Sequence, residues 1–304
     1  EVDGPYGLRK AAWDMMNIEG LAAWYRPHLA RLTSLMAPSA TVYLWNTAEG
    51  WARLDPEMRA LGWEFCSLII WHKTNGQAQK SASVAGWPDV TEVCGTYIRS
   101  PDWPRILTAA LDDCGMTAAE VCRRIGIDSR LLQFWQEKER HPSKELWIRA
   151  WEVLRGPSSV RGMEKIKTWR MQSMQGVRCA TVEEIAAEWE MFRPPFTRNP
   201  DETNVWSVPQ VQDSERLKDS NGDTLHPCQK PLLFAERMVQ ASTRPGMRVL
   251  IPFGGTCRIA TYLERLKRNE PENARYYDCC ELNADGKDYL GAVLGRMGED
   301  AAAK

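Results

Sequence analysis

Short runs of apolar, β-branched and aromatic residues recur along the chain and predict strands that are buried on both faces. These runs cover residues 41–45, 66–71, 247–251 and 276–280. Between them, apolar residues recur at helical spacing over about 18–35, 54–61, 231–242, 256–268 and 284–296. This alternation of strands and helices favours an α/β fold in which a doubly wound sheet has helices on both faces.

The middle of the chain has a different pattern. Helical spacing dominates from about residue 104 to 192, and no strand is predicted there. Prolines and glycines mark both ends of this stretch. We therefore predict that a helical insertion interrupts one α/β domain. The predicted divisions are 1–100 and 201–298 for the two halves of that domain, 101–200 for the insertion and 299–304 for a short tail.

The composition is that of an ordinary globular protein. Hydrophobic residues make up 43% and charged residues 26% of the 304 residues, which excludes a wholly disordered or coiled-coil chain. No apolar run approaches the ~18 residues of a membrane span, and no signal-peptide pattern is present, so we expect a cytoplasmic protein that makes no membrane contact. Nine cysteines without a CxxC pair, and four histidines, predict reduced thiols and no metal site.

The charge is unevenly distributed. The net charge is −1, but residues 140–178 contain nine lysines and arginines against three acids. A local basic excess of this kind is suited to the phosphates of a nucleic acid. A solvated helix face has the same composition and is the alternative interpretation.

Residues 117–136 have the pattern of a helix-turn-helix. Thr117 and Glu120 are spaced as a capping box, Gly126 lies where a tight turn needs a positive φ, and Asp128 can cap a second helix. This stretch resembles the helix-turn-helix of phage-repressor-type regulators, although a plain three-helix packing unit is an alternative. In that motif, residues early in the second helix reach base edges in the major groove. The corresponding positions are Ser129, Arg130 and Gln133, and the arginine fork is suited to guanine.

Several short motifs follow one another in a specific order. The chain begins with Asp3-Gly4-Pro5-Tyr6, and the insertion follows. The segment His226-Pro-Cys-Gln-Lys230-Pro comes next, and Pro-Phe-Gly-Gly-Thr at 252–256 lies some 20 residues later. Glu281 then follows the last predicted strand. This order resembles that of the β class of amino-DNA methyltransferases, over about residues 1–98 and 203–296.

The resemblance implies an enzyme that methylates an exocyclic amine in duplex DNA and uses S-adenosylmethionine as its cofactor. It implies catalytic roles for Asp3, Gly4, Pro5 and Tyr6. The Asp3 carboxylate and the Gly4 carbonyl would accept the two amine hydrogens and so localise the nitrogen lone pair. Pro5 would stiffen the turn, and Tyr6 would stack on a base that has left the duplex. By the same resemblance, an aspartate at the first position implies adenine N6 as the target, since the cytosine-N4 members of the family mostly have serine there.

The resemblance also implies a cofactor site. A strand that runs into a glycine turn and then a helix allows close backbone approach and favours a carboxylate. Glu281 would accept hydrogen bonds from the ribose hydroxyls. His226 and Lys230 would shape the opposite wall, although a structural cap is an alternative role for this histidine. The implied cofactor residues are Phe253, Gly254, Gly255, Thr256, Glu281, His226 and Lys230.

The chain departs from the family pattern at four positions. Gly4 replaces a proline, Ile251 replaces an aspartate, and Cys257-Arg258 replace Gly-Thr. We expect the side chain of Cys257 to crowd the cofactor. The strand expected before Asp3 is reduced to two residues.

We therefore predict an adenine-N6 DNA methyltransferase that binds duplex DNA and can form a homodimer. The central expectation is spatial, because the first residues and the glycine turn near 255 must form the rim of one shared pocket. A catalytically degenerate DNA-binding protein of the same fold and a cytosine-N4 methyltransferase are the alternatives. A metal-dependent nuclease is disfavoured because no acids cluster in the sequence.

Overall fold

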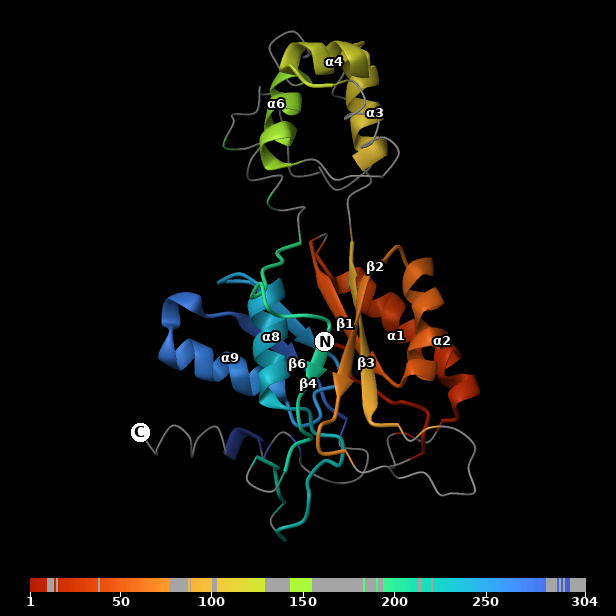
Figure 1. The fold of residues 1–304 in the computed structure, drawn as a ribbon, viewed down its shortest axis with the longest axis vertical. Coiled ribbons are helices and arrows are strands. Elements are labelled where there is room, and N and C mark those ends of the chain that lie inside the picture. Colours follow the sequence, from red (N-terminus) through yellow and green to blue (C-terminus); the bar gives the residue numbers. More distant parts are fainter. Residues whose placement is uncertain are drawn as a thin grey trace. The chain divides into compact units, whose positions relative to one another are not determined.

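In a computed structural model, the protein forms two compact units. The α/β unit is Glu1–Arg99 with Pro195–Lys304, and the helical unit is Ser100–Pro194 (Figure 1). The structure describes residues 1–9, 14, 16–37, 39–76, 87, 89–99, 103–128, 143–154, 183, 190, 194–212, 215–219, 221–282, 289, 291 and 293–295.

Helices and strands alternate along the α/β unit. Its first part contains η1 (Ile18–Gly20), α1 (Leu21–Leu35), β1 (Thr41–Asn46), α2 (Ala48–Ala60), β2 (Glu64–His72) and β3 (Thr91–Ile98). Its second part contains β4 (Val205–Ser207), α8 (Leu232–Ser242), β5 (Arg248–Ile251), α9 (Arg258–Asn269), η3 (Pro271–Asn273) and β6 (Tyr276–Cys279). Strands β3 and β4 were not predicted from the sequence, and α2 begins earlier than predicted.

The strands form two hydrogen-bonded groups. One has the order β1-β3-β2-β4, in which β3 is antiparallel to both of its neighbours and β4 is parallel to β2. The other is the parallel pair β5-β6. Helix α2 connects β1 to β2, and strands connected in this way are expected to be parallel. The two strands are not neighbours, because β3 pairs with both of them and is antiparallel to each.

The first two residues of the chain connect these two groups. The backbone nitrogen of Val2 donates to Tyr43 O at 2.8 Å, and Val2 O accepts from Trp45 N at 2.9 Å. On the other side, the backbone nitrogen of Glu1 donates to Leu250 O in β5 at 3.0 Å. Residues 1–2 therefore run between β1 and β5, and Asp3 follows directly at that junction.

The sheet is covered on both faces. In Figure 1, α1 and α2 lie on one side of the strands, and α8 and α9 lie on the other. Strand β1 shows why: Val42 and Leu44 belong to the core beneath α1 and α2, whereas Tyr43 and Trp45 belong to the core that includes α8 and α9. The predicted doubly wound α/β fold is confirmed.

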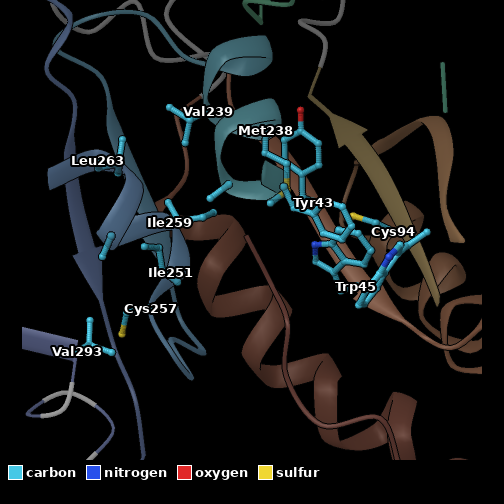
Figure 2. Packing of buried hydrophobic residues seen from close by; sticks show 14 of the residues in the cluster. Tyr43, Trp45, Cys94, Met238, Val239, Ile251, Cys257, Ile259, Leu263 and Val293 are labelled. Carbon is cyan, nitrogen blue, oxygen red and sulfur yellow. The ribbon is translucent and has the colours of Figure 1, made fainter. Parts of the chain in front are cut away.

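Figure 2 shows the larger of these cores. Met238 and Val239 of α8 lie between Tyr43 and Trp45 of β1 on one side and residues of β5 and α9 on the other. The ring of Phe234 stacks on Trp45, with 5.4 Å between the ring centroids. This packing fixes α8 against β1, and the segment that precedes α8 is thereby held near Asp3.

The helical unit contains α3 (Trp103–Cys114), α4 (Ala118–Ile125) and α6 (Lys144–Leu154) around its own core. The Thr117 side chain accepts from Glu120 N at 3.2 Å, and Gly126 ends α4 with φ +70°. The predicted cap and turn are confirmed. Ser129, Arg130 and Gln133 lie outside the described residues, so the helix-turn-helix stays a prediction.

Among the helices that the structure describes, none has the length and apolar character needed to cross a membrane.

Candidate active site

The loop Asp3–Tyr6 is held from two sides. The Pro5 carbonyl accepts from Tyr25 Oη at 3.1 Å and from Asn46 Nδ2 at 3.4 Å. After the loop, Gly7 N and Leu8 N donate to the buried carboxylate of Asp14 at 2.6 and 3.0 Å. These bonds fix the backbone on both sides of Tyr6.

Lys230 brings the second motif to this loop. Its Nζ atom lies 3.1 Å from each carboxylate oxygen of Asp3 and donates to Tyr6 Oη at 3.0 Å. The Tyr6 hydroxyl also donates to Asp3 Oδ1 at 2.8 Å. The Lys230 side chain is 6% exposed, whereas that of Asp3 is 21% exposed. The lysine is therefore interior to the cluster, and the aspartate remains accessible from outside.

Two further residues complete the cluster, and neither was assigned a role from the sequence. Glu92 on β3 contacts Lys230 Nζ through Oε2 at 3.0 Å and Lys73 Nζ through Oε1 at 2.6 Å. Lys73 directly follows β2. Asp3, Glu92, Lys73 and Lys230 together contain two carboxylates and two ammonium groups, so their formal charges cancel.

The charges in this cluster control its ionisation. Burial alone would raise the pKa of Glu92, but the ammonium groups of Lys230 and Lys73 outweigh it and lower that pKa to about 2. Burial alone would lower the pKa of Lys230, but the carboxylates of Asp3 and Glu92 raise it above its ordinary value. Burial, followed by the charges of Asp3 and Glu92, raises the pKa of Tyr6 well above its ordinary value. At neutral pH, Glu92 is therefore ionised, Lys230 is charged and Tyr6 is protonated.

Phe253 joins the glycine turn to the loop. A Cβ atom on Gly4 would lie 3.1 Å from the Phe253 ring. The same ring packs against Trp24 and Tyr25 of α1, with centroid separations of 5.9 and 6.1 Å. The predicted proximity of the first residues to the turn near 255 is confirmed, and a pocket shared by the two segments stays a prediction.

The rest of the turn lies between β5 and the residues after β6. Gly254 N donates to Cys280 O at 2.8 Å, and Gly255 N donates to Glu281 Oε2. A Cβ atom on Gly255, which has φ +50°, would meet the His226 ring at 3.7 Å. The Glu281 carboxylate and the His226 imidazole therefore both lie next to Gly255, where the absence of a side chain allows a ligand to approach the backbone closely. The neighbouring Thr256 is 4% exposed.

His226 also has a local structural role. Its Nδ1 atom accepts from Cys228 N at 3.1 Å, and its ring lies 5.4 Å from that of Tyr289. This hydrogen bond fixes the turn that leads to Lys230. The helix-cap alternative is not borne out, because α8 begins at Leu232 with Pro231 as its N-cap. The imidazole instead fixes a turn, and it lies beside the space that a side chain at Gly255 would occupy.

The sulfur of Cys257 packs in the interior. The residue is 1% exposed, and its Sγ lies 3.4 Å from Cys279 Sγ. Figure 2 shows Cys257 together with Ile251 and Val293 in the core. Little of this side chain is left exposed to crowd a bound ligand, contrary to the sequence expectation. Ile251, which replaces the aspartate of the family pattern, is likewise a core residue.

A pocket of about 470 Å³ lies apart from these residues. It is bordered by the segment 208–217 and by α8 and α9, and it includes the ion pair of Glu215 and Arg258. No residue of the Asp3 cluster lines it.

The chain is similar to known proteins in sequence and in fold. A sequence model of a family described as DNA methylase, of the N6/N4 type, matches residues 1–292. Type II methyltransferase M.HinfI of Haemophilus influenzae is 35% identical over 68 residues, which cover 22% of this chain and 19% of that protein. The chain therefore aligns with about a fifth of the length of this curated relative.

One solved structure of low sequence identity shares the fold. PvuII DNA methyltransferase, described as cytosine-N4-specific, is 10% identical with a TM-score of 0.51, and the match covers 97% of this chain and 77% of that one. M1.HpyAVI, solved as a complex with S-adenosylmethionine, is 11% identical with a TM-score of 0.48, and the match covers 90% and 82% of the two chains.

Proposed function

This chain belongs to the N6/N4 family of DNA methylases, and from that premise we propose that it transfers a methyl group from S-adenosylmethionine to the N6 amine of an adenine in duplex DNA. The observation that carries the proposal is the meeting of Asp3 and Tyr6 with Lys230, beside the Phe253 ring of the glycine turn. This places a partly exposed carboxylate and an aromatic ring next to the segment assigned to the cofactor.

Two features of the turn between β5 and α9 support a role in binding S-adenosylmethionine. Gly255 has a left-handed backbone, and the only side chain near its Cβ position among the described residues is that of His226. The Glu281 carboxylate accepts from the Gly255 amide, so it lies where ribose hydroxyls can donate to it. We assign the cofactor to Phe253, Gly254, Gly255, Thr256, Glu281 and His226. When bound, S-adenosylmethionine supplies a methyl group on a sulfonium sulfur.

Asp3 and Gly4 act on the nucleophile. The lone pair of an exocyclic amine is delocalised into the base, which makes the nitrogen a poor nucleophile. Hydrogen bonds from the two amine hydrogens to the Asp3 carboxylate and the Gly4 carbonyl concentrate electron density on the nitrogen. The Asp3 carboxylate is also the nearest group that can take the proton that the amine loses. Lys230 pairs with this carboxylate from the interior side.

Tyr6 binds the base. Extruding a base from a duplex costs a few kcal/mol, which the pocket must recover by stacking and hydrogen bonding. The Tyr6 hydroxyl is held by hydrogen bonds to Asp3 and Lys230, so the ring has a fixed orientation. A fixed ring loses little conformational entropy when a base stacks on it.

Residues 101–200 are assigned to target recognition, with Ser129, Arg130 and Gln133 as base-contacting residues. The cap at Thr117 and the left-handed turn at Gly126 support the first half of a helix-turn-helix. Arg130→Ala is expected to lower affinity for the target sequence at least tenfold more than for random DNA. Arg123→Ala, which removes an exposed arginine paired with Glu120 on α4, is the matched control. An equal loss on both DNAs would contradict base contact by Arg130.

A cytoplasmic location and a homodimer remain part of the proposal. The cytoplasm is a reducing compartment, which keeps the cysteines as thiols. An enzyme located there also has access to DNA. Sedimentation in the presence and absence of DNA tests the dimer.

The deciding experiment is methyl transfer by the full chain. The protein is incubated with labelled S-adenosylmethionine and unmethylated DNA, and the digested nucleosides are identified by mass spectrometry. We expect N6-methyladenine. Asp3→Asn is expected to reduce transfer at least 1000-fold and to leave binding of cofactor and DNA within threefold. Asp278→Asn, at an exposed acid of β6, is the matched control.

Two results would replace this proposal. N4-methylcytosine would establish the cytosine-specific alternative. Binding of DNA and cofactor without any methylated nucleoside would establish a catalytically degenerate protein.

A further inference from the structure

The partly buried carboxylate of Glu92 makes three polar contacts. It accepts from Lys73 at 2.6 Å through Oε1, and it contacts Lys230 at 3.0 Å and Tyr6 Oη at 3.2 Å through Oε2. The side chain is 16% exposed. Burying a carboxylate costs several kcal/mol unless it is paired, and here two ammonium groups pair with it. The contact with Tyr6 adds nothing to this charge balance, because the hydroxyl is neutral.

The Tyr6 hydroxyl has a choice of acceptor. Asp3 Oδ1 lies 2.8 Å from it and Glu92 Oε2 lies 3.2 Å from it. A hydroxyl has one hydrogen and so donates to one carboxylate at a time. When the hydroxyl donates to Asp3, its hydrogen occupies an acceptor position on Oδ1. The proposed reaction needs that oxygen for the target amine. When the hydroxyl donates to Glu92, that position on Asp3 is free.

We propose that Glu92 is a positioning residue for methyl transfer, which accepts the Tyr6 hydroxyl hydrogen as the target amine binds and so leaves Asp3 Oδ1 available to the amine. This inference rests on the proposed function and deepens it. The only change required is a rotation of the Tyr6 hydroxyl about its Cζ–Oη bond, because both carboxylate acceptors already lie within hydrogen-bond distance.

Lys73 keeps the Glu92 carboxylate in the required orientation. It binds Oε1 at 2.6 Å, so Oε2 is directed to Lys230 and Tyr6. Lys73 also lies 4.9 Å from the centroid of the Trp71 ring, which holds the ammonium group from another side. The ionised state of Glu92 at neutral pH suits an acceptor, since an ionised carboxylate has only acceptor sites.

A kinetic cycle tests this role. Glu92→Gln is combined with Tyr6→Phe, which keeps the ring and removes the hydroxyl. With Tyr6 present, we expect Glu92→Gln to lower kcat at least tenfold at saturating cofactor and DNA. In the Tyr6→Phe background we expect a loss of less than threefold, because no hydroxyl competes for Asp3. An equal loss in both backgrounds would overturn the proposed role.

Glu92→Asp covers the case in which the glutamine variant does not fold. It keeps the charge between the two lysines and withdraws the carboxylate from Tyr6 by one methylene group. We expect the same dependence on the Tyr6 hydroxyl, with a thermal transition close to that of the unaltered protein. A kcat within twofold of the unaltered enzyme would contradict the proposal.

A measurement without turnover separates this inference from the proposed function. The protein is labelled with ¹³C at the ζ carbon of tyrosine, and the Tyr6 resonance is identified by its absence from Tyr6→Phe. We expect Glu92→Asp to shift the Tyr6 resonance and to leave that of Tyr262, on α9, unchanged. An unchanged Tyr6 resonance would overturn the contact with Glu92. Absence of methyl transfer by the unaltered protein would instead overturn the proposed function, and the resonance would still decide the contact.

Discussion

The hydroxyl group of Tyr25 occupies the space that a β-carbon on Gly4 would need. Tyr25 is fully buried in α1, and its hydroxyl donates to the Pro5 carbonyl. The glycine that replaces proline in the family pattern is therefore matched by a side chain from another element. The absence of a side chain at Gly4 therefore leaves room for the Tyr25 hydroxyl, so this departure from the family pattern is not a defect in the loop.

This relationship predicts coupling between the two positions. Gly4→Ala is expected to cost about 1–3 kcal/mol of unfolding free energy through overpacking. Tyr25→Phe should cost about 1 kcal/mol through its lost hydrogen bond, and Asn46 remains as a second donor to Pro5. The double variant is expected to lose clearly less than the sum, because the hydroxyl that opposes the new methyl group is gone. Urea unfolding of the four proteins measures the coupling, and strict additivity would show that Tyr25 does not determine the glycine.

Cys257→Gly tests whether the sulfur affects the cofactor. Cys257 has φ +49°, a left-handed conformation in which glycine avoids a cost of about 1 kcal/mol. The variant also loses a buried side chain, so the two effects on unfolding free energy oppose one another. Because the sulfur faces Cys279 in the core, we expect the dissociation constant for S-adenosylmethionine to change less than threefold in calorimetric titration. Binding at least tenfold tighter in the glycine variant would show that the sulfur crowds the cofactor.

Glu281→Gln tests the ribose-binding role. Hydrogen bonds to a charged group contribute about 1.5–3 kcal/mol, so we expect the variant to bind S-adenosylmethionine about tenfold to a hundredfold more weakly. At saturating cofactor, kcat should remain within threefold, since the Glu281 carboxylate binds the Gly255 amide and has no assigned part in activating the amine. Asp278→Asn is the control, because this exposed acid lies on the adjoining strand and pairs with Arg248. Equal affinities for the two variants would argue against the assignment of Glu281.

The strands that the sequence predicted are rich in apolar, β-branched and aromatic residues. Strand β1 is buried on both faces, and its run of Thr41 and four apolar or aromatic residues is visible in the sequence. Strand β3 was missed because Glu92, Gly95 and Thr96 interrupt its apolar pattern. Its burial depends on partners from distant segments, such as Lys230 for Glu92, and a local pattern carries no information about such pairs.

The same reason explains the parts of the site that were missed. The motifs identified Asp3, Tyr6 and Lys230, because each lies in a short run with recognisable neighbours. Glu92 lies within a strand and has no motif around it, and Lys73, just after a strand, had no role assigned from the sequence. Only the fold brings both residues to the cluster. The assignment of Lys230 to the cofactor wall also came from motif order, whereas the structure places its ammonium group on Asp3 and Tyr6.

The low pKa of Glu92 predicts how acid destabilises the α/β unit. The pKa is about 2 in the folded protein and near 4.5 without its partners, so the folded state binds this proton less readily than the unfolded state. The resulting stabilisation is present above about pH 4.5 and is lost as the pH falls toward 2. A shift of this size corresponds to about 3 kcal/mol, as an order of magnitude.

Between pH 5 and pH 2, the unfolding free energy of the unaltered protein should therefore fall by about 3 kcal/mol more than that of Glu92→Gln, which has no proton to bind at this position. Urea unfolding at successive pH values measures both curves. Glu57→Gln is the control, because Glu57 pairs with the exposed Arg26 at the surface, where such pairs contribute about 0–1 kcal/mol. Its curve should therefore stay within about 1 kcal/mol of parallel to that of the unaltered protein. If the Glu92→Gln curve is also parallel, the two ammonium groups do not hold Glu92 ionised, and the charge balance inferred for the cluster is wrong.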